Sequence, residues 1–65
     1  MPYASNHQLP PGVRDNLPSH AQDIYREAFN HALTEYGGDE PRAHRVAWGA
    51  VEKKYEKRDD HWVAK

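Results

Sequence analysis

The chain has 65 residues, a formal net charge of −1 and no cysteine. A chain this short buries only about 60% of the surface that it exposes when unfolded, which is near the lower limit for folding alone. It therefore predicts a single domain over residues 1–65. The lack of cysteine excludes disulfide bonds and thiolate metal sites, and no stretch approaches the roughly 20 apolar residues of a membrane-spanning helix. Residues 1–7 have no basic start and no apolar run, so we expect a cytoplasmic protein without a secretory signal.

The first 18 residues predict irregular structure that contains one short helix. Three prolines and a glycine between positions 2 and 12 prevent a long helix there. One helical turn at residues 12–17 would place Val13 and Leu17 on the same side, and the proline that follows would end it. Tyr3 and Leu9 are apolar anchors, so we expect this segment to lie on the core.

Residues 19–36 predict the main helix. Apolar residues recur along it at intervals of three or four, which is typical of one continuous apolar face. They are Ala21, Ile24, Tyr25, Ala28, Phe29, Ala32, Leu33 and Tyr36. Ser19 and Gln22 have the spacing of a capping box at the start of this helix. Gly37 is the expected left-handed residue at its end.

Residues 41–57 predict a second helix, because acidic residues followed by a proline mark a helix start. The connection between the two helices has only about four residues, which predicts an antiparallel hairpin. The core between the helices is expected to contain Phe29, Leu33, Val46 and Val51.

The tail, residues 59–65, is too short for another helix. Trp62 and Val63 predict that it folds back onto the core, as a short strand beside Tyr3. The predicted fold is therefore mostly α. It consists of an antiparallel helical hairpin and a short N-terminal helix, with the termini packed over them, in part as a small two-stranded sheet.

The charges are segregated along the chain. Residues 15–40 hold six acids and one base, and residues 42–58 hold six bases and two acids, so their net charges are −5 and +4. We favour charge complementarity between packed elements as the reason. The alternative is a polar partner that is attracted by the field of one segment.

The apolar face of the second predicted helix is too wide for a single partner helix. At 100° per residue it spans about 200°, and its alanines suit close approach to the first helix. His44, Trp48 and Tyr55 remain on an edge that needs another cover. We favour the chain's own termini, through Tyr3, Leu9 and Trp62. The alternative is an aromatic surface that binds a protein partner. Its candidate residues are His44, Trp48, Tyr55 and Tyr3.

Five histidines raise the question of a metal site, but their spacing does not predict one. His20 and His31 lie on one side of the first helix about 16 Å apart, too far for one ion. The best chelate is Glu27 with His31, one turn after Asp23, and we favour an ordinary solvated contact there. His44 is expected to be a packed residue with one hydrogen bond. We therefore predict no metal and no cofactor.

Catalysis is not predicted either. Ser19 is expected to act as a cap, and no histidine is placed to activate it. No glycine-rich phosphate loop is present, because Gly37 and Gly38 follow a helix and precede acids. We therefore expect a binding module and not an enzyme.

A basic strip on the second predicted helix is the alternative binding face, for nucleic acid. It consists of Arg42, Arg45, Lys53, Lys57 and Arg58. The near-neutral balance and the interspersed Glu52 and Glu56 argue against nucleic acid, since nucleic-acid-binding domains are usually strongly basic. We favour a solvated face.

Two blocks of this sequence resemble the ChaB family, whose members are named as regulators of cation transport. The first runs from Leu17 to Tyr25, LPSHAQDIY, and continues to Ala28-Phe29-Asn30. The second is Ala43 to Trp48, AHRVAW, with Ala50-Val51 and Tyr55. The opening Met1-Pro2-Tyr3 and Leu9-Pro10, followed by Val13, are also similar to the family.

The resemblance implies a compact, mostly helical fold with a small sheet, no cofactor and no catalytic residues. It also implies a role in regulating a sodium or calcium/proton antiporter. Family members can carry a longer charged connection between the two helices, in place of residues 37–40 here. We therefore expect a small cytoplasmic, non-catalytic interaction module with a protein partner, a membrane antiporter. A nucleic-acid-associated protein is the alternative.

Overall fold

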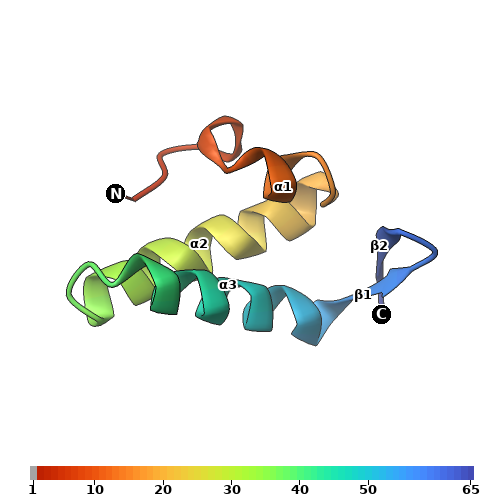
Figure 1. Ribbon diagram of the computed structural model, residues 1–65. Coiled ribbons are helices and arrows are strands. Elements are labelled where there is room, and N and C mark those ends of the chain that lie inside the picture. The colour runs from red at the N-terminus through yellow and green to blue at the C-terminus, as the bar shows by residue number, and fades with distance from the viewer. Residues whose placement is uncertain (1) are drawn as a thin grey trace.

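The computed structural model describes residues 2–65 and confirms a mostly helical fold with a small antiparallel sheet. The elements are the 3-10 turn η1 (Asn6–Gln8), α1 (Pro11–Arg14), α2 (Ser19–Glu35), α3 (Glu40–Lys54), β1 (Tyr55–Arg58) and β2 (His61–Ala64). Figure 1 shows α2 and α3 side by side and antiparallel, with the N-terminal segment on the other side of α2. Within residues 2–65, no helix is both long enough and apolar enough to cross a membrane.

The turn between α2 and α3 has the predicted chemistry. Gly37 and Gly38 take positive φ values of 67° and 90°, and the Gly38 N–H donates to the Leu33 carbonyl at 2.7 Å. Asp39 then caps α3, because its side chain accepts a hydrogen bond from the Arg42 N–H at 3.2 Å. These contacts satisfy backbone groups that both helix ends would otherwise leave unpaired.

The predicted capping box at the start of α2 is wrong. Pro18 occupies the N-cap position, and Ser19 is already the first helical residue. The side-chain amide of Gln22 instead donates to the backbone carbonyls of Leu17, at 2.7 Å, and Arg14, at 3.0 Å. Gln22 therefore ties the end of α1 to the first turn of α2.

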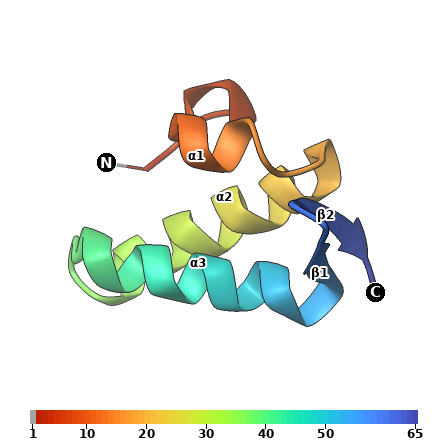
Figure 2. The same cartoon turned by 45° about the vertical axis from the view of Figure 1, so that its right-hand side comes forward.

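Helix α3 ends three residues earlier than predicted, because residues 55–58 pair with the tail. Tyr55 pairs with Ala64 and Arg58 with His61 in an antiparallel hairpin. Asp59 and Asp60 make the two-residue turn with φ values of 46° and 70°, the left-handed pair that such hairpins favour. The expected strand beside Tyr3 is therefore wrong, and Figure 2 shows the hairpin beside the start of α2.

The core lies between α2, α3 and the N-terminal segment. Its buried residues are Leu9, Val13, Leu17, Ala21, Tyr25, Phe29, Ala32, Leu33, Ala43, Ala47, Val51 and Tyr55. Phe29, Leu33 and Val51 are confirmed as core residues, but Val46 is 39% exposed. Val46 lies about 100° around α3 from Ala47, so it turns away from the face that meets α2.

The N-terminal segment packs on α2. The Tyr3 ring lies 4.9 Å from Phe29, centroid to centroid. The Asn30 side chain accepts from the Tyr3 N–H at 2.8 Å and donates to the Tyr3 carbonyl at 2.7 Å. Asn6 donates to Asp23 at 2.6 Å. We expected Tyr3 to cover the Trp48 edge of α3, and the structure places it against α2 instead.

Candidate functional site

Four aromatic rings from three elements meet beside α3. Tyr25 comes from α2, His44 and Trp48 from successive turns of α3, and Trp62 from β2. Tyr25 lies edge-on to His44 at 5.8 Å and to Trp48 at 5.6 Å, and Trp48 lies 5.5 Å from Trp62. Edge-on and offset contacts of this kind are the favoured geometries of aromatic pairs. The C-terminal hairpin thus supplies the cover for Trp48 that we expected from the termini.

Hydrogen bonds fix the ring of His44 between two neighbours. The Trp48 Nε1–H donates to His44 Nε2 at 3.0 Å, and His44 Nδ1 is hydrogen-bonded to the Tyr25 hydroxyl. Because an indole N–H can only donate, His44 Nε2 must accept and carries no proton. The ring proton of His44 then lies on Nδ1, and this N–H donates a hydrogen bond to the Tyr25 hydroxyl. His44 therefore has two hydrogen bonds, where we expected one.

Tyr25 is the buried member of this group. Burial, and to a smaller extent the nearby Tyr3, raise the pKa of Tyr25 to about 12 from its ordinary value of 10.0. Low-polarity surroundings disfavour the phenolate, so Tyr25 stays a neutral hydroxyl. Tyr25 is therefore available as the acceptor that His44 requires.

The structure brings together only some of the predicted partner-binding residues. His44 is exposed, and Trp48 and Trp62 are half-buried, so these three residues form one accessible aromatic surface. Tyr55 is buried, with its hydroxyl hydrogen-bonded to His20 Nδ1 at 3.0 Å. Tyr3 lies on α2. Sequence reasoning missed Tyr25 as a partner of His44, because periodicity marks Tyr25 only as a core residue.

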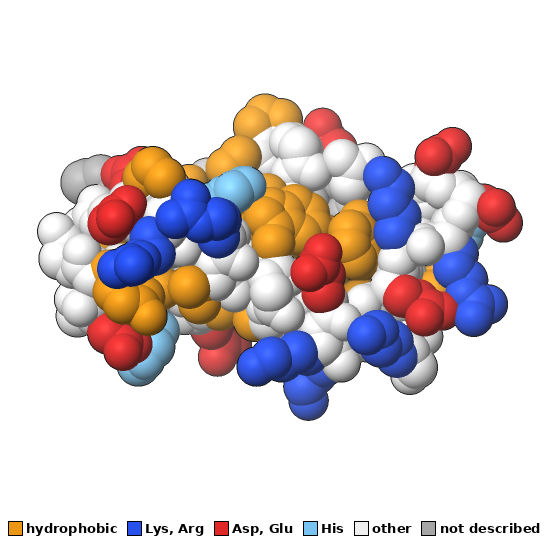
Figure 3. All heavy atoms as spheres, turned by 60° about the horizontal axis from the view of Figure 1, so that its bottom comes forward, with side chains coloured by type: hydrophobic (Ala, Val, Ile, Leu, Met, Phe, Trp, Pro, Cys, Tyr) orange, Lys and Arg blue, Asp and Glu red, His pale blue; other side chains and the backbone are white. Residues whose placement is uncertain are grey.

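The predicted basic strip is divided between two elements. Arg42, Arg45 and Lys53 are exposed on the outer side of α3, whereas Lys57 and Arg58 belong to β1. Figure 3, which views the molecule from the α3 side, shows hydrophobic side chains exposed at the centre with basic and acidic side chains interspersed around them. This surface has mixed charge.

The ion pairs described within residues 2–65 are local in sequence. They are Arg14–Asp15, Arg26–Asp23, His31–Glu35 and Arg58–Glu56. None of these pairs joins the acidic residues 15–40 to the basic residues 42–58. They therefore give no support to charge complementarity between these two segments.

The candidate chelate on α2 is not assembled. His31 Nε2 lies 3.2 Å from Glu35, one turn beyond it, and not against Glu27. Asp23 is engaged by Asn6 and Arg26. In the part of the chain that the structure describes, no three histidine, aspartate or glutamate side chains gather closely enough to hold a metal ion.

The family model of ChaB matches residues 9–65, which is most of the chain. The chain belongs to the ChaB family. This confirms the resemblance that the two sequence blocks indicated.

ChaB proteins of known sequence are close relatives. The chain is 49% identical to the "Putative cation transport regulator ChaB" of Escherichia coli K12, over 92% of this chain and 91% of the relative. The protein of the same name from Shigella flexneri has the same identity and coverage. The alignment spans 69 positions and this chain has 65 residues, so the relative carries residues that have no counterpart here.

A solved ChaB structure has the same fold. The NMR solution structure of ChaB superimposes with a TM-score of 0.88 at 46% identity, over 98% of this chain and 99% of that chain. The small sheet that the ChaB resemblance implied is therefore part of the shared architecture.

Proposed function

We propose that this ChaB-family chain regulates cation transport by binding a sodium or calcium/proton antiporter from the cytoplasmic side. The names of its relatives support the regulatory role. The observation that carries the binding mode is the aromatic surface of His44, Trp48 and Trp62. The partner is a protein, and the chain acts without catalysis.

The aromatic surface has the properties of a protein contact. Tryptophan is enriched among residues that dominate binding energy, and rigid rings lose little conformational entropy when they are covered. Trp48 is already held by Tyr25, His44 and Trp62, so its orientation is set before a partner arrives. Exposed Arg45, next to His44 in sequence, favours a partner segment that combines an apolar side chain with an acidic one.

Nucleic acid is not proposed as the partner. Arg58 is paired with Glu56, and the remaining bases of the predicted strip are divided between α3 and β1. A protein that tracks a phosphate backbone presents a continuous basic face, since each phosphate contact contributes to affinity.

The test uses the purified chain with membrane vesicles that contain a sodium or calcium/proton antiporter. We expect the chain to co-sediment with these vesicles and to change the rate of cation/proton exchange. His44→Ala and Arg45→Glu should weaken both effects while the amide spectrum stays that of a folded protein. Val46→Ala is the matched control, because Val46 is exposed on the outer side of α3.

Two results would contradict the proposal. An exchange rate that the wild-type chain leaves unchanged in both kinds of vesicle would exclude the antiporter as the target. Equal effects of His44→Ala, Arg45→Glu and Val46→Ala would exclude the aromatic surface as the contact.

A further inference from the structure

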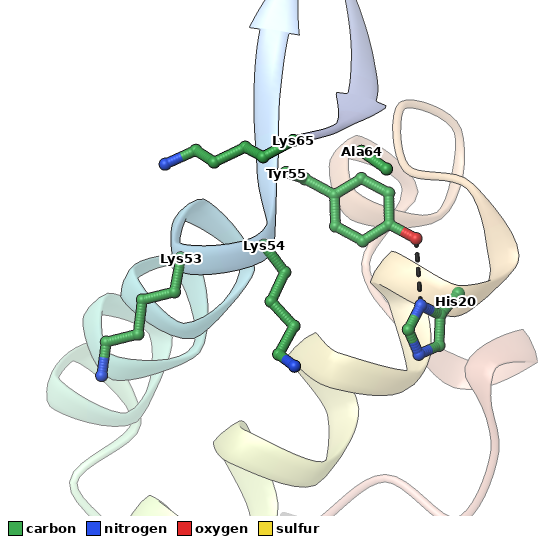
Figure 4. A pocket seen from close by; sticks show the side chains of 6 residues that line it. All are labelled: His20, Lys53, Lys54, Tyr55, Ala64 and Lys65. Carbon is green, nitrogen blue, oxygen red and sulfur yellow. Dashed lines mark hydrogen bonds between the residues drawn. The ribbon is translucent and has the colours of Figure 1, made fainter.

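A second site lies where the hairpin meets the ends of the two long helices. An open pocket of about 360 Å³ is lined by His20 of α2, Lys53 and Lys54 of α3, and Tyr55, Ala64 and Lys65 of the hairpin (Figure 4). This volume is within the range of small-molecule sites, about 300–1,000 Å³. The pocket holds none of the three residues of the aromatic surface.

The charged side chains that line this pocket are all basic. Three of the four lysines of the chain line it, and none of its side chains is acidic. Within residues 2–65, none of these three lysines forms an ion pair with an acidic side chain. Like charges close together repel one another, so an anion between them would be attracted by all three.

His20 and Tyr55 add polar groups to the same pocket. His20 Nδ1 is hydrogen-bonded to the Tyr55 hydroxyl at 3.0 Å, which fixes the imidazole ring. Figure 4 shows the second ring nitrogen of His20 and the ammonium group of Lys54 below the Tyr55 ring, whereas Lys53 and Lys65 extend away from it. Lysine side chains rotate about four bonds, so Lys53 and Lys65 can turn toward a bound anion.

The start of α2 contributes in the same direction. His20 belongs to the first turn of α2, which contains no acidic residue and has no capping side chain. The partial positive charge of this helix end is therefore not offset by a carboxylate of its first turn. The last turn of α3, at the same pocket, carries the opposite partial charge, which Lys53 and Lys54 of that turn offset.

We propose that this pocket binds a phosphate-bearing anion. A phosphate group carries up to two negative charges and several acceptor oxygens, and lysine is a common point-charge partner for it. A single carboxylate would use only part of this arrangement. Lys54 and His20 provide the principal contacts with the anion, and Lys53 and Lys65 add positive charge around it. The site is independent of the antiporter proposal, because it uses other residues.

The test is a titration of the full chain with inorganic pyrophosphate, followed by amide NMR. We expect saturable shifts at His20, Lys54, Tyr55 and Lys65. Lys54→Gln should weaken the affinity about fivefold, the effect of losing one charge contact in a solvated site. Lys57→Gln is the matched control, because Lys57 is the one lysine outside the pocket and loses the same charge. Both positions are exposed, so both variants should keep the wild-type spectrum.

A second arm of the experiment distinguishes the two sources of the phosphate group, a lipid headgroup and a soluble phosphate compound. If vesicles of phosphatidylglycerol bind the chain, vesicles of phosphatidylcholine do not, and pyrophosphate competes, the ligand is a lipid headgroup. If pyrophosphate binds and neither vesicle does, the ligand is a soluble phosphate compound. Equal weakening by Lys54→Gln and Lys57→Gln would overturn the site, since it would show only general attraction to a cationic segment. Absence of saturable shifts together with absence of vesicle binding would overturn it too.

Discussion

Trp48 donates its indole N–H to Nε2 of His44, one turn earlier on α3, at 3.0 Å. This contact makes Nε2 of His44 the acceptor, because a proton on Nε2 would place two donors against each other. It also links the accessible part of the aromatic surface to the buried Tyr25, which His44 contacts through its other nitrogen. The surface is therefore an extension of the core.

The first prediction follows from this link. His44→Ala removes the partner of the buried Tyr25 hydroxyl and one hydrogen bond of Trp48, so it should lower the free energy of unfolding by about 1–3 kcal/mol. Urea denaturation measures the change. Val46→Ala, on the exposed side of α3, should stay within about 0.5 kcal/mol of the wild type. A loss for His44→Ala as small as that for Val46→Ala would show that the hydrogen bonds do not stabilise the fold.

The second prediction concerns the core. Phe29 is 3% exposed and contacts both Tyr3 and Tyr25 through its ring. Phe29→Ala should cost about 3–5 kcal/mol, which is most of the stability of a small domain. We expect loss of the cooperative thermal transition in circular dichroism. A melting temperature equal to that of the wild type would exclude Phe29 as a central packing residue.

The third prediction is a dependence on alkaline pH. Tyr25 has a pKa of about 12 in the folded chain, above its ordinary value of 10.0. Between about pH 10 and pH 12 the unfolded chain releases this proton while the folded chain keeps it. The stability from neutral Tyr25 is therefore fully present below pH 10 and is lost as pH rises toward 12.

Melting temperatures measured across this range, with tyrosinate absorbance, test that prediction. Tyr25→Phe cannot ionise, so its melting temperature should fall less steeply with pH than that of the wild type. The same slope in both proteins would mean that another group causes the alkaline loss.

The fourth prediction concerns the hairpin turn. Asp60 has a φ of 70°, a left-handed conformation that glycine adopts without strain. Asp60→Gly creates an Asp-Gly turn, the favoured pair for this two-residue loop, and should raise the melting temperature. Asp60→Ala should lower it, because alanine has the strain without the compensating side chain of aspartate. The two substitutions should change the melting temperature in opposite directions. A lower melting temperature for Asp60→Gly would contradict the turn assignment.

The two long helices could be predicted from sequence because their signals are local. The spacing of apolar residues along α2, the glycines after it and Asp39 before α3 act within a few residues. The start of β1 could not be predicted in this way. Tyr55 lies four residues after Val51, which continues the helical pattern, and only pairing with β2 makes it a strand residue. That pairing is a tertiary effect.

The same distinction applies to the candidate site. His44 and Trp48 are four residues apart, so their contact could be anticipated from helix geometry. Tyr25 and Trp62 join them from other elements, and no spacing in the sequence indicates which core aromatic would meet which edge. Val46 shows the reverse error, because a hydrophobic residue at the border of an apolar face can still turn toward solvent.

The convergence of α2, α3 and β2 on Trp48 has a consequence for recognition. A partner that contacts Trp48 and Trp62 together finds them adjacent only when all three elements are in place, so it distinguishes the intact protein from a fragment. A peptide of residues 40–54 carries Trp48 but lacks Tyr25 and Trp62, and should therefore be a poor competitor. Occupancy of this surface would in turn hold the native state against unfolding, by an amount set by partner concentration.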